Sequence, residues 1–146
     1  MIWYVALGSA AGGVSRYLVD LWFARNGLPW ATLLINITGS FLLGFLIRIP
    51  LVPATLSPEV RAMLTVGLCG SFTTFSTFTA ETIRLAQDGA WSKAVGYVAA
   101  SVLLGLLAGL AGLALGSQLF SRPIAQSPNR LIANRPIAQS PNRLIA

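Results

Sequence analysis

The stretch that decides the fold runs from residue 67 to residue 81 and has the sequence GLCGSFTTFSTFTAE. It lies inside a long apolar segment, residues 60–87, yet six of the nine residues from 71 to 79 are serine or threonine. A buried hydroxyl group needs a hydrogen-bond partner, and bonds to the carbonyl one turn earlier can satisfy only a few of them. Glycine at position 70 also weakens a helix. We therefore expect a helix that is interrupted between Gly70 and Thr74.

The hydroxyl groups of this stretch alternate with three phenylalanines, Phe72, Phe75 and Phe78. Non-helical backbone at membrane depth is tolerated only inside protein or beside a water-filled space. The stretch is therefore expected to line a polar path or an ion site. A polar seam between two packed helices is the alternative, because small and hydroxylated residues also join membrane helices.

The composition of the chain indicates an integral membrane protein. The chain has 146 residues, of which 55% are hydrophobic and 10% charged, and a mean hydropathy of +0.71. In a soluble domain about a quarter of the residues are charged. No basic stretch or cleavage site precedes the first apolar segment, so we expect no removable signal peptide. A single cysteine, Cys69, excludes an intramolecular disulfide. With no histidine and only four acidic residues, the chain is not expected to be an enzyme.

Four apolar segments are each long enough to span a bilayer, which takes about 20 residues. They cover residues 2–24, 30–49, 60–87 and 91–119. Aromatic rings favour the headgroup level of a membrane, and the four tryptophans all fall at expected span ends: Trp3, Trp22, Trp30 and Trp91. Residues 1–121 are therefore predicted to form an all-α domain of four transmembrane helices, with the third helix broken near the middle of the membrane.

Residues 122–146 form a separate tail with an internal repeat. The sequence RPIAQSPNRLIA at residues 122–133 recurs without a change at residues 135–146. Repeats that build a fold stack on one another and bury a shared face, which two short proline-containing copies cannot do. We expect the tail to be flexible and to derive from a recent duplication or from cloning. Four of the ten basic residues lie in it, so the net charge of +6 does not predict nucleic-acid binding.

Several polar side chains inside the spans need partners. Arg16 in the first span either faces a cavity or a partner or extends toward the nearer membrane surface. Asn36 in the second span can make up to four hydrogen bonds, so it is either a clasp between helices or a donor in a pore. In the fourth span, Tyr97 and Ser101 are four residues apart and place two hydroxyl groups on one side of the helix.

The charges near the span ends give the chain no preferred orientation. Cytoplasmic loops normally carry the excess of lysine and arginine. Here each side of a four-span chain carries three, when Arg16 and the later arginines of the tail are left out. One side has Arg48, Arg61 and Arg122, and the other has Arg25, Arg84 and Lys93. We expect such a chain to insert in both orientations and to pair as an antiparallel, dual-topology homodimer.

Three motifs resemble a known family. They are GGVSRY at residues 12–17, WATLLIN at residues 30–36 with Gly39 and Ser40 following, and GLCGSFTTFSTF at residues 67–78. With these motifs the chain resembles the Fluc family of fluoride ion channels, over about residues 2 to 120. The last motif is the most specific of the three, and the tail has no part in the resemblance.

The resemblance implies a four-helix subunit in an antiparallel dimer of the inner cell membrane, with two fluoride pathways per dimer. It also implies a central, structural sodium ion, held by the backbone carbonyls of Gly70 and Thr73 from both subunits. The implied fluoride pathway consists of Asn36, Thr74, Phe75, Ser76, Phe78, Tyr97 and Ser101. The chain departs from some relatives at Gly105, where a hydroxyl group would extend the track on the fourth helix. Arg16 and Glu81 also match, and the resemblance implies a structural or vestibule role for them.

The chemistry of these residues agrees with the implied activity. Fluoride holds its hydration water strongly, so a pathway must replace that water with closely spaced donors, such as an amide and hydroxyl groups. The positive edges of phenyl rings can also face an anion, although core packing is the alternative for Phe75 and Phe78. We therefore expect a fluoride-selective, passive channel that exports cytoplasmic fluoride.

Two other kinds of membrane protein are alternatives. A small dual-topology exporter of cationic drugs also has four spans, but it needs a titratable acid at mid-membrane depth, where the first span has Arg16. An assembly subunit held together by small residues would transport nothing.

Overall fold

The computed structural model describes residues 1–23, 30–49 and 56–120, and every regular element within them is helical. The expected turn at residues 25–29 and the repeated tail lie outside these residues. Seven helical elements follow one another along the chain: α1 (Ile2–Phe23), α2 (Trp30–Arg48), α3 (Pro58–Ala62), the π-helix η1 (Met63–Cys69), α4 (Gly70–Phe72), α5 (Phe75–Gln87) and α6 (Trp91–Phe120). Their bounds agree closely with the four predicted segments.

The third predicted segment is interrupted, as expected. Helical backbone continues from α3 through η1 to α4, and then Thr73 and Thr74 are extended, with ψ angles of 155° and 116°. The interruption therefore lies at the C-terminal end of the predicted interval. Gly70 keeps helical angles, with φ −65° and ψ −31°, so its expected weakening of the backbone does not place the break. The π-helix before it was not predicted.

Side-chain caps define the ends of the broken segment. Ser57 accepts a hydrogen bond from the amide of Val60 at 3.3 Å and so begins α3. Thr74 accepts one from the amide of Thr77 at 3.2 Å and begins α5 in the same way. Such caps satisfy amides that have no partner within the helix. Gly89 follows α5 with a φ angle of 73°, a conformation that glycine adopts without strain.

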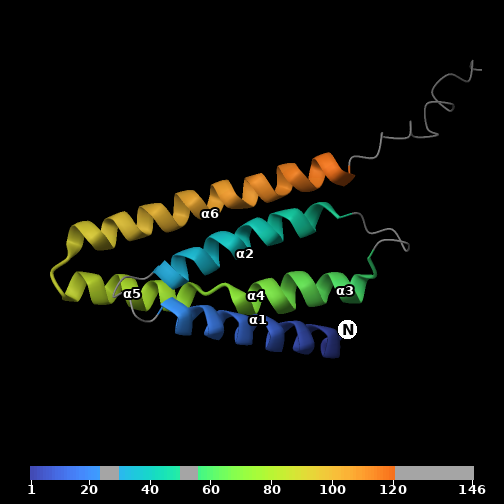
Figure 1. Ribbon diagram of the computed structural model, residues 1–146, viewed down its shortest axis with the longest axis horizontal. Coiled ribbons are helices and arrows are strands. Elements are labelled where there is room, and N and C mark those ends of the chain that lie inside the picture. The colour runs from blue at the N-terminus through green and yellow to red at the C-terminus, as the bar shows by residue number, and fades with distance from the viewer. Residues whose placement is uncertain (24–29, 50–55, 121–146) are drawn as a thin grey trace, which may run out of the picture.

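Two seams of glycine hold the helices together. A Cβ atom on Gly8 or Gly12 of α1 would collide with backbone atoms of η1. Along the other seam, a Cβ atom on Gly44 of α2 or Gly112 of α6 would collide with the backbone of the opposite helix. Close approach of this kind is typical of helices that pack within a membrane. As a result α1 lies along η1 and α4, and α2 lies along α6 (Figure 1).

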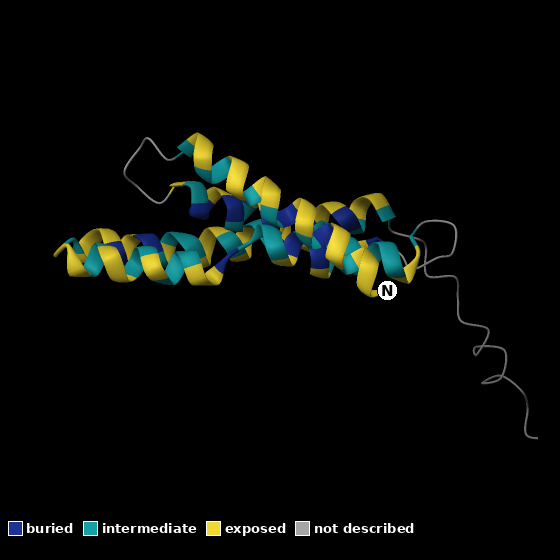
Figure 2. Cartoon of the chain, turned by 90° about the horizontal axis from the view of Figure 1, so that it is seen from below, coloured by how far each residue is buried: buried dark blue, intermediate teal, exposed yellow. Residues whose placement is uncertain are grey.

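The outer surface of the helices is largely apolar. Exposed residues cover most of the outside of the chain, and buried ones lie where the helices meet (Figure 2). On α6 the exposed side chains include Leu103, Leu106, Leu107 and Leu110. Among the described residues, α2 and α6 are long and apolar enough to cross a membrane. An apolar surface of this extent on an all-helical chain indicates a membrane protein.

Candidate functional site

The side chain of Asn36 joins α2 to the break in the third segment. Its Nδ2 atom donates to the carbonyl oxygen of Thr74 at 3.2 Å, and its Oδ1 atom accepts from the amide of the same residue at 2.9 Å. One side-chain amide therefore satisfies both the backbone amide and the backbone carbonyl of Thr74. This residue is 7% exposed and has extended rather than helical backbone. The clasp between helices, one of the two predicted roles, is confirmed. Since an amide nitrogen carries two hydrogens, one remains for another acceptor.

Hydroxyl groups gather around the same break. Thr73 Oγ1 donates to the carbonyl of Cys69 at 2.9 Å, and the Thr73 amide donates to the same carbonyl at 3.0 Å. Thr74 Oγ1 donates to Thr77 Oγ1 at 3.1 Å and lies 3.2 Å from Ser76 Oγ. Ser76 itself is exposed. The hydroxyl-rich sequence therefore stabilises an interruption rather than a continuous polar seam.

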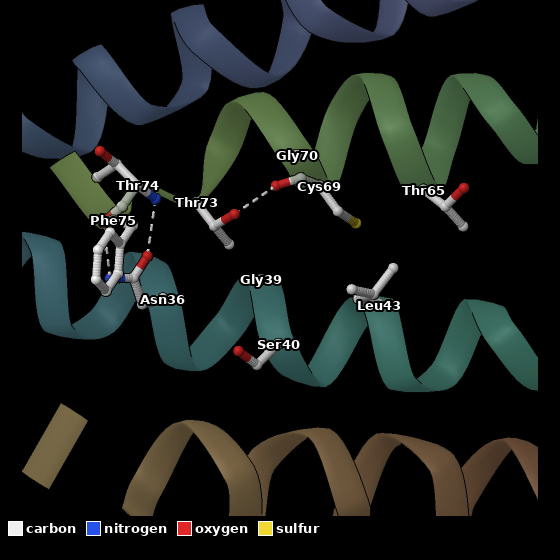
Figure 3. A pocket seen from close by; sticks show the side chains of 10 residues that line it. All are labelled: Asn36, Gly39, Ser40, Leu43, Thr65, Cys69, Gly70, Thr73, Thr74 and Phe75. Atoms are coloured by element: carbon white, nitrogen blue, oxygen red, sulfur yellow. Dashed lines mark hydrogen bonds between the residues drawn. The ribbon is translucent and has the colours of Figure 1, made fainter. Parts of the chain in front are cut away.

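A pocket of about 280 Å³ lies beside the break, between α2 and the third segment (Figure 3). The small residues Gly39 and Ser40 face it from α2, and Thr65 and Cys69 face it from η1. At one end the pocket is closed by the hydrogen-bonded pair of Asn36 and Thr74. The remaining lining residues are Leu43, Gly70, Thr73 and Phe75.

The carbonyls of Gly70 and Thr73 lose their usual helical partners. In a continuous helix they would accept from the amides of Thr74 and Thr77. Here the Thr74 amide donates to Asn36, and the Thr77 amide donates to Thr74 Oγ1. Both residues line the pocket. Hard, uncharged carbonyl oxygens of this kind suit an alkali cation, so the donor set fits the implied sodium ion.

An aromatic row leads from the break to α6. The ring centroids of Phe75 and Phe78 are 5.6 Å apart, and those of Phe78 and Tyr97 are 5.3 Å apart, with tilted planes in both pairs. Phe75 is 79% exposed, which does not fit the alternative that it fills a core within one subunit. Phe78 is partly buried and Tyr97 is buried. The structure thus brings three of the implied pathway residues into one line.

Glu81 lies at the far end of this row and binds two hydroxyl groups. Tyr97 donates to its Oε2 atom at 2.7 Å, and Thr32 donates to its Oε1 atom at 2.9 Å. Thr32 is 1% exposed and was missed by the sequence analysis. Its position one helical turn before Asn36 places both on the same side of α2, which is the signal that could have indicated it.

The positions that remain from the sequence analysis are Ser101, Gly105 and Arg16. Ser101 follows Tyr97 by one turn, and its Oγ atom is buried without a hydrogen bond among the described residues. Gly105, one turn further, offers no hydroxyl group, and a Cβ atom placed on it would meet only the Ser40 hydroxyl. Arg16 is partly buried on α1, one helical turn before Asp20. It is not among the residues that line the pocket.

Comparisons with known proteins agree with the resemblance. The family model for CrcB-like protein, Camphor Resistance (CrcB), matches residues 3–113. The chain is 45% identical over 114 residues to a protein of Rhizobium meliloti named fluoride-specific ion channel FluC, with 76% of this chain and 91% of that protein covered.

Two further relatives with the same name come from distant bacteria. The identity is 45% over 118 residues for the protein of Thermus thermophilus, covering 79% of this chain and 92% of the relative. For the protein of Chlorobaculum tepidum the identity is 49% over 104 residues, covering 70% of this chain and 82% of the relative. On the strength of these matches, the chain belongs to the CrcB-like family.

Proposed function

We propose that this protein is a fluoride-specific, passive ion channel that exports fluoride from the cytoplasm. Its relatives carry the name of fluoride-specific ion channels, and a family of ion channels leaves no role as an enzyme. The observation that carries the proposal is the break at Thr73 and Thr74, because it sets a pocket with amide and hydroxyl groups in its lining beside a row of aromatic rings. Transport needs such a polar opening in an otherwise apolar helix.

Along the proposed pathway, fluoride meets donors in place of water. Near the break, the free hydrogen on Asn36 Nδ2 and the exposed hydroxyl group of Ser76 supply them. Thr74 lines the route there, and its own hydroxyl hydrogen is given to Thr77 Oγ1. From there the edges of Phe75 and Phe78 face the anion. Tyr97 and Ser101 continue the route along α6, where the Ser101 hydroxyl group is the donor because Tyr97 gives its own hydrogen to Glu81. Because the Gly105 position has no hydroxyl group, this track ends after Ser101. Glu81 orients Tyr97 by accepting its hydrogen bond.

The proposed assembly is an antiparallel dual-topology dimer of four-span subunits in the inner cell membrane, with two pathways. Two observations support a second subunit at the break. The unpaired carbonyls beside the pocket would be costly against lipid, and Phe75 is largely uncovered in one chain. Two copies of Gly70 and Thr73 would provide four carbonyl oxygens for a central sodium ion. That ion would supply positive charge at the dimer centre and would join the two broken helices.

Fluoride efflux from liposomes that hold the purified protein tests the proposal. An electrode should record fluoride release once potassium can move to compensate the charge. Fluoride release that needs a proton gradient, or chloride efflux at a comparable rate, would exclude a passive fluoride-selective channel. The alternative of a small exporter of cationic drugs predicts proton-dependent cation efflux instead. Family membership does not support that alternative.

A further inference from the structure

Besides the bonds of Asn36 to Thr74 and of Thr32 to Glu81, another polar clasp joins α2 to the third segment, at the C-terminal end of α2. The Nη2 atom of Arg61 in α3 donates to the carbonyl oxygens of Leu46 at 3.3 Å, Ile47 at 3.1 Å, and Ile49. Among the described residues, the clasps made by Asn36 and Arg61 are the only side-chain hydrogen bonds between α2 and residues 58–74. Arg61 therefore binds the C-terminal end of α2, whereas Asn36 lies in the N-terminal half of α2 and binds Thr74.

The position of Arg61 suits the chemistry of a helix end. The last carbonyls of a helix have no partner within it, and the negative end of the helix dipole attracts a cation. A guanidinium group offers several donors in a fixed plane, so one side chain can bind several carbonyls at the end of the helix. Arg48 also lies in the last turn of α2, but it is exposed and makes none of these bonds.

The pocket beside the break lies between the two clasps. Two of the four α2 residues that line it, Gly39 and Ser40, are small, and the main packing of α2 is against α6 rather than η1. At the Arg61 end, Leu46 and Ile49 form a buried cluster with Cys69 of η1. Cys69 is 1% exposed and also lines the pocket. Two of the three carbonyls that Arg61 binds, those of Leu46 and Ile49, thus belong to the buried cluster that contains Cys69.

We propose that Arg61 is a positioning residue that holds the C-terminal end of α2 against η1 and so fixes the width of the pocket. Without its hydrogen bonds, the end of α2 separates more readily from η1, and Leu46 and Ile49 uncover Cys69. Thr65, which lines the pocket, also bonds to the Arg61 carbonyl at 2.9 Å. The effect on pocket width stands by itself, and only its consequence for fluoride flux rests on the proposed function.

Because Cys69 is the single cysteine of the chain, its thiol reports on this contact directly. The full-length protein and the variants Arg61→Gln, Arg61→Lys and Arg48→Gln are treated with N-ethylmaleimide without fluoride, and mass spectrometry follows the labelling. Losing a charge-assisted hydrogen bond shifts an opening equilibrium by about tenfold or more, so Arg61→Gln should label at least about tenfold faster than the parent. Arg61→Lys should fall between them, because its ammonium keeps the charge without the planar fork. Arg48→Gln should match the parent.

Fluoride flux through the same preparations links the contact to transport. Flux is expected to fall in Arg61→Gln, to recover partly in Arg61→Lys and to stay at the parent level in Arg48→Gln. The proposal is overturned if the Arg61 variants fold and label at the parent rate, or if Arg48→Gln accelerates labelling as much as Arg61→Gln. If Arg61→Gln does not fold, unchanged labelling in folded Arg61→Lys overturns it equally. Fast labelling in a protein that carries no fluoride would refute the proposed function and leave the role of Arg61 intact.

Discussion

Asn36 replaces, with one side chain, two backbone hydrogen bonds that the third segment loses at Thr74. Both bonds reach a residue that is almost fully buried, where water cannot substitute for a missing partner. The same amide retains one hydrogen for an anion. Asn36 can therefore fix the shape of the break and take part in the proposed pathway at the same time, so the two predicted roles are compatible.

Replacing Asn36 by alanine should impair both roles. The buried amide and carbonyl of Thr74 would be left unpaired, at a cost of about 1–3 kcal/mol in the free energy of unfolding. Fluoride flux should fall at least about tenfold, which corresponds to about 1.4 kcal/mol on the barrier. Thr38→Ala is the matched control, because Thr38 bonds only to carbonyls of its own helix. Equal stability of the two variants would contradict the clasp.

Fluoride flux should depend on the aromatic rings of Phe75 and Phe78 and not only on the volume that these side chains fill. Exchanging a phenylalanine for isoleucine in a packed core usually costs less than about 1.5 kcal/mol, but an aliphatic chain has no positive edge to offer an anion. Phe75→Ile and Phe78→Ile should each lower fluoride flux at least about tenfold, while the dimer elutes normally from a sizing column.

Phe72 provides the control for this pair. It is partly buried and lies close to Gly39, which agrees with the expected packing role. Phe72→Ile should therefore change flux only slightly. If all three substitutions leave flux near the parent level in well-folded dimers, the aromatic row is not part of the pathway, and the route must follow the hydroxyl groups instead.

At the scale of elements, the third segment changes its hydrogen-bonding pattern before it breaks. The π-helix η1 lies directly before α4, and the amide of Gly70 donates to the carbonyls of both Gly67 and Thr65. Short π-helical stretches often occur at functional sites. Here the stretch lines the pocket with Thr65 and Cys69 and leads into the extended residues Thr73 and Thr74.

The glycine seam between α2 and α6 should tolerate no added methyl group. In Gly112→Ala the new Cβ atom would meet the backbone of Phe41, which cannot move without separating the helices. Overpacking of this kind costs typically 1–3 kcal/mol, so we expect the free energy of unfolding to fall by roughly that amount. Gly105→Ala, on the same helix, meets only the Ser40 hydroxyl at 3.8 Å and should be within about 0.5 kcal/mol of the parent. Thermal unfolding in detergent measures the stability of both variants. Equal stability would contradict close packing of α2 and α6 at Gly112.

For the whole molecule, the proposed sodium ion should couple dimer stability to the cation content of the buffer. The carbonyls of Gly70 and Thr73 carry no formal charge, so an alkali cation fits them better than a divalent metal. In buffer that is strictly free of sodium and potassium, both flux and the dimer fraction should decrease, and sodium should restore them. Full activity and an intact dimer in that buffer would count against the ion.

Dual topology makes a separate prediction. With the repeated tail deleted, a reporter fused at Ser121 should be found on both sides of the membrane, because the basic residues near the span ends are evenly divided. An assay for enzymatic activity of the reporter in each compartment measures the distribution. Detection on one side alone would exclude an antiparallel pair.

The sequence by itself determined the helices, their ends and the position of the break to within a few residues. These features depend on local chemistry: apolar length, tryptophans at span ends, capping residues, and hydroxyl groups that compete with the helix around residues 71–79. The identity of the polar residues was also visible in the sequence, because an amide or a carboxylate inside an apolar segment is unusual wherever its partner lies.

Only the tertiary structure decided which of these groups meet. Asn36 and Thr74 are 38 residues apart, and Thr32 and Glu81 are 49 apart. Their pairing depends on which helices approach closely, and the glycine seams set that approach through backbone contacts that no side-chain pattern specifies uniquely. For the same reason, the sequence did not indicate that Arg61 binds the end of α2. Its acceptors are backbone carbonyls, which every residue has, so only the arrangement of the helices selects those of Leu46, Ile47 and Ile49.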